Sequence, residues 1–297
     1  MIKPARFLDP SLLLKLSRLN LVARLVVEGF ISGLHRSPYH GFSVEFSEHK
    51  VYTPGDDLKF LDWKVMARTD RYYVKRFQEE TNLKAYILLD ASGSMAFGSG
   101  EINKFQYGLL LTASLSYLLI RQRDAVGLVT FDEKVRRYIP AKSGNRHLRI
   151  ILEELELLKP GKVTRINRVF HYLAETIKRR GLIIVISDLF DEPEEVIRAI
   201  RHFRHRKHEV IVFHLLDPYE IEFPFKGIGE FLDMETKDKL TVNPLTVRDE
   251  YWARFDSFIY HYRKAFSESL VDYVRVNISQ PLDFFLLSYL RKRARLS

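Results

Sequence analysis

Three oxygen-bearing side chains follow one short apolar run. Residues 86–89 are apolar throughout, and Asp90, Ser92 and Ser94 come directly after them. One carboxylate and two hydroxyls are hard oxygen ligands, which suit a cation such as Mg²⁺. The same residue types are also common in turns that follow strands. The spacing Asp-x-Ser-x-Ser alone therefore leaves two interpretations open, a metal site and a polar turn.

A second carboxylate and a third hydroxyl stand further along the chain. Residues 182–186 form another apolar run, which ends at Ser187 and Asp188, and the loop 160–164 before it ends in Thr164. If the two runs are neighbouring parallel strands, Asp188 and Thr164 converge on the sheet edge that carries Asp90. Two carboxylates and three hydroxyls, completed by water, would form an octahedral shell for Mg²⁺, or for Mn²⁺ or Ca²⁺.

These residues must be positioned by a sheet with helices between its strands. Apolar runs without polar alternation are typical of strands buried on both faces. The sequence predicts strands at 86–89, 126–131, 182–186, 210–216 and 273–278, with 135–140 as an antiparallel neighbour of 126–131. It predicts helices at 105–121, 147–158, 169–179, 193–206, 247–270 and 281–293, and a hairpin through Leu232 and Leu240. We expect an α/β fold with a doubly wound, mostly parallel sheet.

The first 82 residues have a different pattern, so we expect a small appendage over 1–82 and the α/β domain over 83–297. Asp9 and Pro10 form a favourable helix start, and apolar residues recur at helical spacing to about residue 31. Residues 42–46 alternate as in a half-buried strand. Asp57 is a candidate cap for a short helix, and 71–77 is a candidate strand.

Composition excludes several classes of protein. The 297 residues are 46% hydrophobic and contain no cysteine, which rules out disulfides, thiol nucleophiles and cysteine-based zinc sites. Charged residues interrupt the most apolar segment, 12–34, so we expect no transmembrane segment. No signal-peptide pattern is present, and we expect a cytoplasmic protein.

The sequence also carries features of nucleic-acid binding and of zinc binding. The net charge is +9, which suits nucleic acid, a membrane surface or an acidic partner. However, the many acidic residues between 35 and 82 would repel phosphate, so we expect no nucleic-acid partner. His202, His205 and His208 recur at helical spacing as zinc ligands do, but the arginines between them would repel a cation.

The metal-site residues resemble the metal-ion-dependent adhesion site of von Willebrand factor A-like domains. The resemblance implies that Ser92, Ser94 and Thr164 ligate the metal directly or through water, and that Asp90 and Asp188 anchor it. Upstream strings extend the likeness: His35-Arg36-Ser37-Pro38, Tyr52-Thr53-Pro54-Gly55-Asp56-Asp57, Asp62-Trp63-Lys64 and Val74-Lys75-Arg76-Phe77. Together they resemble a bacterial family catalogued as domain of unknown function fifty-eight. Its members are typically encoded beside MoxR-type AAA+ ATPases, and many carry N-terminal membrane helices.

Two functions from different classes follow. The first is a non-enzymatic adaptor or chaperone-like factor, in which the carboxylate of a protein partner completes the metal shell. The resemblance implies a MoxR-type AAA+ ATPase or its client as that partner. The second is a Mg²⁺-dependent phosphohydrolase that uses the same site. The sequence lacks a phosphate-binding Gly-x-x-x-x-Gly-Lys loop and a Gly-x-Ser-x-Gly elbow, so we expect no enzyme.

Overall fold

The computed structural model describes residues 19–35, 49–51, 72–75, 83–161, 165–233 and 238–294. The chain divides into two compact units, Leu34–Asn82 on the one hand and Met1–Gly33 with Leu83–Ser297 on the other. Within the smaller unit, β1 (His49–Val51) pairs antiparallel with β2 (Tyr73–Lys75). The strand predicted at 71–77 therefore coincides with β2. The strand predicted at 42–46 and the short helix after Asp57 lie outside the described residues.

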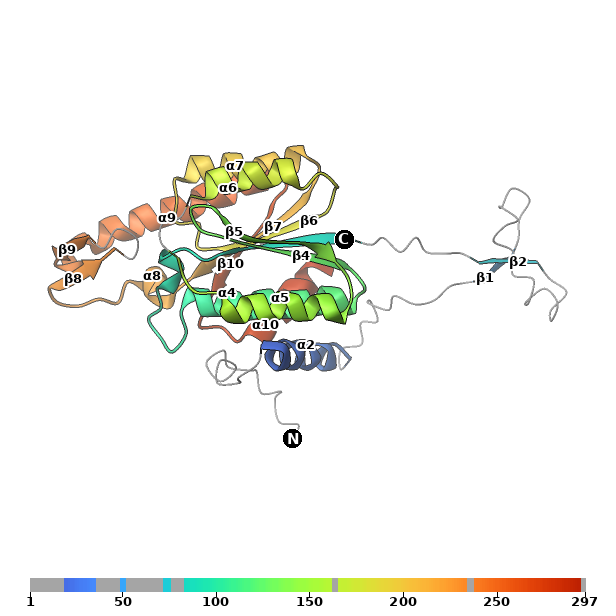
Figure 1. Ribbon diagram of the computed structural model, residues 1–297. Helices are drawn as coiled ribbons and strands as arrows, with labels where there is room; N and C mark the ends of the chain where they lie inside the picture. The colour runs from blue at the N-terminus through green and yellow to red at the C-terminus, as the bar shows by residue number, and fades with distance from the viewer. Residues whose placement is uncertain are drawn as a thin grey trace, which may run out of the picture. The chain divides into compact units, whose positions relative to one another are not determined.

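A six-stranded sheet forms the centre of the larger unit (Figure 1). Its strands are β3 (Lys84–Asp90), β4 (Ala125–Phe131), β5 (Val135–Lys142), β6 (Leu182–Ser187), β7 (Glu209–Leu216) and β10 (Asp272–Asn277). The spatial order is β10-β7-β6-β3-β4-β5, and only the pair β4–β5 is antiparallel. This order is that of a doubly wound sheet whose direction of winding changes between β3 and β6, which confirms the predicted fold class.

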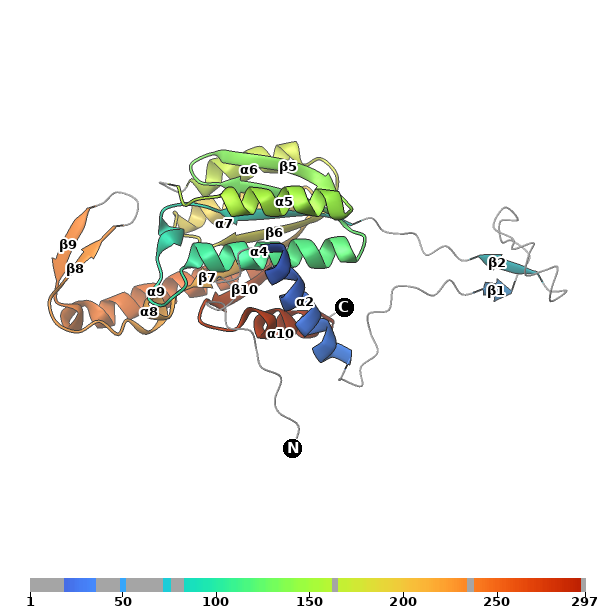
Figure 2. The ribbon, with the colours of Figure 1, turned by 60° about the horizontal axis from the view of Figure 1, so that its bottom comes forward.

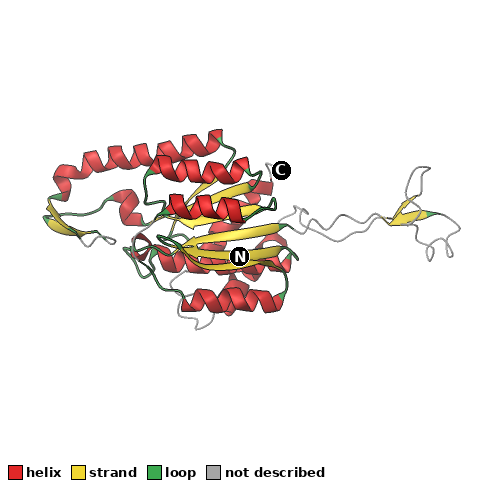
Figure 3. Ribbon diagram, turned by 45° about the horizontal axis from the view of Figure 1, so that its top comes forward, coloured by secondary structure: helices red, strands yellow, loops and turns green. Residues whose placement is uncertain are grey.

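Helices cover both faces of this sheet (Figures 1 and 3). One face carries α4 (Lys104–Arg121), α5 (Asn145–Leu157) and α10 (Leu282–Ala294), and the other carries α6 (Ile166–Thr176), α7 (Pro193–His205) and α9 (Pro244–Glu268). Alternate side chains of β3 enter the two cores: Ile87 and Leu89 face α4, while Leu88 faces α6. Burial on both faces explains why the strand reads as an unbroken apolar run.

Helix α2 (Leu19–His35) packs on the α4–α5 side of the larger unit, as Figure 2 shows. Val22, Ala23 and Val26 are fully buried in the core shared with α4 and α5, and the Leu19 amide donates to Glu156 Oε1 at 3.1 Å. The helix predicted for this region thus belongs to the α/β unit. The larger unit includes Met1–Gly33, whereas the sequence predicted one appendage over 1–82.

An arm extends from the carboxyl end of β7 (Figures 1 and 2). We define it as α8 (Pro218–Glu222), the antiparallel hairpin of β8 (Gly229–Leu232) and β9 (Lys239–Val242), and the first half of α9. Aromatic rings of Phe223, Phe225, Phe231 and Tyr251 pack against one another inside it. Because α8 directly follows β7, the arm starts at the sheet edge where the site residues lie.

Candidate metal site

The structure brings four of the five predicted site residues together. Asp90 is the last residue of β3, and Ser92 and Ser94 lie on the loop that follows it. Asp188 follows the last residue of β6, which pairs in parallel with β3. All four therefore lie at the point where the winding of the sheet changes direction, which is the usual place for ligand sites in open α/β sheets.

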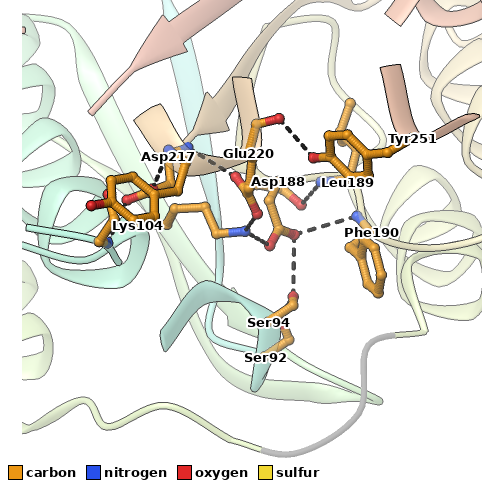
Figure 4. A network of polar contacts seen from close by, with 12 residues as sticks. Ser92, Ser94, Lys104, Asp188, Leu189, Phe190, Asp217, Glu220 and Tyr251 are labelled. Atoms are coloured by element: carbon orange, nitrogen blue, oxygen red, sulfur yellow. Dashed lines mark hydrogen bonds and ion pairs between the residues drawn. The ribbon is translucent and has the colours of Figure 1, made fainter. Parts of the chain in front are cut away.

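Hydrogen bonds connect these side chains into one cluster, and Figure 4 shows the part of it around Ser94 and Asp188. The hydroxyls of Ser92 and Ser94 are 3.0 Å apart, and Ser94 Oγ donates to Asp188 Oδ1 at 3.2 Å. The Ser92 amide donates to Asp90 Oδ1 at 2.9 Å, and the Ser187 hydroxyl donates to Asp90 Oδ2 at 2.6 Å. Both oxygens of Asp90 are thus held by protein donors, one from its own loop and one from β6.

Two of the four side chains keep a small exposed surface. Asp90 and Ser92 are completely buried, while Ser94 and Asp188 keep exposed fractions of 7% and 4%. Phe190, whose amide donates to Asp188 Oδ1 at 3.3 Å, is 61% exposed beside them. A group that approaches from solvent therefore meets Ser94 and Asp188 first, with an apolar ring next to them.

A lysine that the motif did not include completes the cluster. The Lys104 ammonium donates to Asp188 Oδ2 at 2.7 Å and to Glu220 Oε1 at 2.6 Å (Figure 4). Lys104 begins α4, where the preceding Asn103 and Gln106 form a reciprocal capping box. This cap fixes the first turn of α4, so the lysine side chain starts from a well-defined position beside β6.

Glu220 connects the cluster to the arm. Its second oxygen, Oε2, accepts the Asp217 amide at 2.8 Å within the capping box of α8. Asp217 in turn accepts the Ser99 amide at 2.8 Å, and Tyr251 of α9 donates to the Glu220 carbonyl at 2.6 Å. The loop after β3, the start of α8 and the first half of α9 are thus joined by polar contacts around one glutamate.

The electrostatics of the cluster indicate a shortage of positive charge. Burial and the negative charge of Asp188 raise the pKa of Asp90 to about 7, against the lowering effect of its hydrogen bonds. Burial also raises the pKa of Glu220, although Lys104 opposes this. For Lys104, burial lowers the pKa, but the attraction of Asp188 and Glu220 outweighs it, so the pKa is above its ordinary value. One ammonium does not fully compensate the carboxylates around it.

Thr164, the fifth predicted site residue, lies outside the described residues. The residues on either side are placed beside the cluster: the Gly161 amide donates to the Ala91 carbonyl at 2.5 Å, and the Arg165 amide donates to the Asp132 carbonyl at 3.3 Å. The position of Gly161 admits no side chain, because an added Cβ would lie 2.4 Å from Asp132 Oδ2. The assignment of Thr164 to the site stays a prediction.

The donor set fits a hard divalent cation. Neighbouring ligands in an octahedral Mg²⁺ shell, with bonds of about 2.1 Å, lie about 3.0 Å apart. The pairs Ser92 Oγ–Ser94 Oγ and Ser94 Oγ–Asp188 Oδ1, at 3.0 and 3.2 Å, have this spacing. No group of three His, Asp or Glu side chains able to hold a metal occurs in the described ranges, so hydroxyl ligands are essential to any metal site here.

The histidines considered for zinc have other contacts. His202 Nδ1 lies 2.9 Å from His171 Nδ1 and its other nitrogen lies 3.1 Å from Glu175. His208 is buried, with its Nε2 3.0 Å from the Ile177 carbonyl. The His202 contacts tie α7 to α6, and the His208 contact ties the loop after α7 to the chain that follows α6.

Sequence reasoning did not find Lys104, Glu220 or the role of Ser187. Lys104 and Glu220 are 116 residues apart, and neither belongs to a spacing motif. A lysine at the start of a helix is a weak signal, because the helix dipole disfavours a cation there. Ser187 could have been found, since it precedes Asp188 at the end of a predicted strand.

A doubly wound sheet with an Asp-x-Ser-x-Ser loop at its switch point is the arrangement that the resemblance to von Willebrand factor A-like domains implied. The chain belongs to the family described as "Protein of unknown function DUF58", which matches residues 48–257 and confirms the family predicted from the motifs.

The chain is also similar to proteins whose names assign no activity to it. The uncharacterised protein Rv1480 of Mycobacterium tuberculosis is 27% identical over 248 residues, which cover 82% of this chain and 77% of that protein. The conserved hypothetical protein BatB of Bacteroides thetaiotaomicron is 16% identical, with a TM-score of 0.48, over 72% of this chain and 99% of that one. The SpRpn10 VWA domain is 13% identical, with a TM-score of 0.43, over 69% and 93%.

None of the described helices is both long enough and apolar enough to cross a bilayer. The predicted cytoplasmic location stays a prediction.

Proposed function

We propose that this protein is a metal-dependent, non-enzymatic adaptor that docks an acidic side chain of a protein partner on a divalent cation. Ser92, Ser94, Asp188 and Asp90 would hold the cation, with Thr164 as a further ligand. The observation that carries this proposal is the spacing of Ser92 Oγ, Ser94 Oγ and Asp188 Oδ1, with consecutive distances of 3.0 and 3.2 Å.

The protein side of the site is suited to binding rather than turnover. The hydroxyls of Ser92 and Ser94 carry no charge, so they would leave the charge of a bound Mg²⁺ free to attract a carboxylate. Ser94 and Asp188 keep a small exposed fraction, and the exposed ring of Phe190 offers an apolar contact to the residues around the docked acid. Lys104 is occupied by Asp188 and Glu220, which leaves it unsuited to act as a general base.

The family resemblance implies which partner should be tested first. We propose a MoxR-type AAA+ ATPase, or a client of that ATPase, as the protein that presents the acid. The Mg²⁺-dependent phosphohydrolase is the competing hypothesis. No described contact favours it, since the cluster provides no unpaired acid or base beside the two serines.

The test is a binding assay with purified components. The full chain is incubated with the MoxR-type ATPase encoded in the same genome, in Mg²⁺ and in EDTA. We expect capture in Mg²⁺, loss of capture in EDTA, and loss with Asp90→Asn. Ser267→Ala, a change on the exposed side of α9, is the matched control and retains binding.

Two results would refute the proposal. Capture that survives both EDTA and Asp90→Asn would show that the metal site takes no part in docking. Metal-dependent hydrolysis of p-nitrophenyl phosphate by the purified chain, abolished by Asp90→Asn, would favour the phosphohydrolase.

A further inference from the structure

Lys104 is an unusual residue for its position. Its exposed fraction is 2%, and it is the only lysine or arginine among the fully buried side chains of the described ranges. It is also the first residue of α4, where the positive end of the helix dipole disfavours a cation. A buried charge raises the free energy of the folded state unless it is paired. The contacts of the ammonium must therefore provide a gain in free energy that offsets both the cost of its burial and the unfavourable helix dipole.

Two carboxylates provide that gain. Asp188 Oδ2 and Glu220 Oε1 accept from the Lys104 ammonium at 2.7 and 2.6 Å, which are distances of strong, charge-assisted hydrogen bonds. The ammonium also lies 5.6 Å from the centre of the Phe97 ring, close enough for a cation–π interaction. Figure 4 shows the lysine pointing between the two acids, of which Asp188 directly follows β6 and Glu220 belongs to α8.

The charges of the cluster do not cancel. Asp90, Asp188 and Glu220 with Lys104 carry a net charge of −2 when all four groups are ionised. Asp188 and Glu220 meet at Lys104, whereas the donors to Asp90, Ser187 and Ser92, are neutral. Lys104 thus compensates the negative charge of Asp188 and Glu220, on the side of the cluster away from the two serines.

We propose that Lys104 is a permanent internal counter-ion, which keeps the metal-free site folded so that a divalent ion binds and leaves without unfolding the loop. This inference rests on the proposed function for the metal and extends it to the metal-free state. The same ammonium ties α8, and with it the arm, to Asp188 through Glu220.

The first test is Lys104→Met, which retains much of the side-chain volume and removes the charge. Thermal unfolding of the full chain is measured in EDTA and in Mg²⁺, with Lys178→Met at an exposed position as the control. In EDTA we expect the Tm of Lys104→Met to fall by about 5–15 °C, because two carboxylates lose their shared partner. Mg²⁺ should raise its Tm by more than it raises that of the wild type.

A second variant separates charge from packing. Lys104→Met combined with Glu220→Gln removes one negative charge as well, so the net charge of the cluster returns to −2. We expect this double variant to recover at least half of the Tm lost in EDTA, and to fold even if Lys104→Met alone does not. Its Mg²⁺-induced rise should return toward that of the wild type.

The inference is overturned by either of two results. One is an unchanged Tm for Lys104→Met in EDTA, and the other is an equal loss in the single and double variants, which would show that the lysine acts through packing. A wild type that shows no response to Mg²⁺ would refute the proposed docking function instead, while the comparison of variants in EDTA would still decide the role of Lys104.

Discussion

The Ser187 hydroxyl donates to Asp90 Oδ2 at 2.6 Å, across the neighbouring strands β6 and β3. The Leu189 amide donates to the same hydroxyl at 2.9 Å, so Ser187 is both a donor and an acceptor at the centre of the cluster. This contact fixes the orientation of the most deeply buried carboxylate of the site.

Ser187→Ala is therefore expected to destabilise the protein and to weaken Mg²⁺ binding. The change leaves Asp90 Oδ2 and the Leu189 amide without their partner, which reduces the free energy of unfolding by about 1–3 kcal/mol. Denaturant unfolding and calorimetric Mg²⁺ titration measure the two effects. Ser187→Thr, which keeps the hydroxyl, should retain more of the affinity than Ser187→Ala, and an equal loss in both would contradict a hydrogen-bonding role.

Ser92→Ala combined with Ser94→Ala should reduce Mg²⁺ affinity at least tenfold while the protein stays folded. The two hydroxyls are neutral, and apart from Asp188 they contact each other, so their removal leaves no buried charge unpaired. Calorimetric titration with Mg²⁺ gives the affinity and circular dichroism verifies the fold. Ser267→Ala serves as the control, and full affinity in the double variant would eliminate the hydroxyls as ligands.

Asp90 gives the metal-free protein a defined pH dependence. Its pKa is raised to about 7 in the folded state and is about 3.9 in an unfolded chain. The folded state therefore holds this proton more tightly. Its contribution to stability is complete below about pH 4 and is lost as the pH rises toward 7. Each pKa unit corresponds to about 1.4 kcal/mol, so the loss amounts to a few kcal/mol.

Asp90→Asn removes this titration. Measured in EDTA between pH 4 and pH 8, its free energy of unfolding should fall less steeply with pH than that of the wild type, and the two curves should separate most near neutral pH. Parallel curves would show that Asp90 is not the group responsible for the pH dependence.

The same variant should show no Mg²⁺-induced rise in Tm, whereas the free energy of unfolding of the wild type should rise by about 2.7 kcal/mol at a Mg²⁺ concentration of 100 Kd.

Gly161→Ala should perturb the site from its other side. An added Cβ would lie 2.4 Å from Asp132 Oδ2 and 3.0 Å from the Ala91 carbonyl, so either the loop or Asp132 must move. We expect a loss of about 1–3 kcal/mol in stability and weaker Mg²⁺ binding. Gly100→Ala is the matched control, because nothing lies within 4 Å of its added Cβ. Equal behaviour of the two variants would contradict the close approach.

The sequence predicted the sheet well because its strands are buried on both faces. The apolar runs at 86–89 and 182–186 have no polar alternation, and β3 and β6 are found there. Once the winding order was assumed, Asp90 and Asp188 had to share an edge. The position of Ser92 and Ser94 then followed from their distance to the end of β3.

Helix starts were predicted less accurately because their caps come from distant or ambiguous residues. Helix α6 begins at Ile166 rather than 169, and the Ile166 amide is capped by Asp191 from the β6–α7 loop. Helix α9 begins at Pro244 rather than 247, with Asn243 as its cap. The predicted start at 247 leaves out the Asn-Pro pair, although Asn is a favourable cap and Pro is suited to the first position of a helix.

The electrostatic partners of the site could not be predicted at all. The ion pairs of Lys104 with Asp188 and Glu220 span 84 and 116 residues. Nothing local distinguishes these residues from the many charged residues on the surface. Only the packing of α4 and α8 against the edge of the sheet selects them.

The bond between Ser187 and Asp90 joins residues 97 positions apart in the chain. During synthesis the first half of the cluster emerges long before the second, so a chain that has not yet paired β6 with β3 lacks half of the proposed ligands. Under the proposed docking function, only the completely folded protein would therefore bind its partner, and a nascent chain would not.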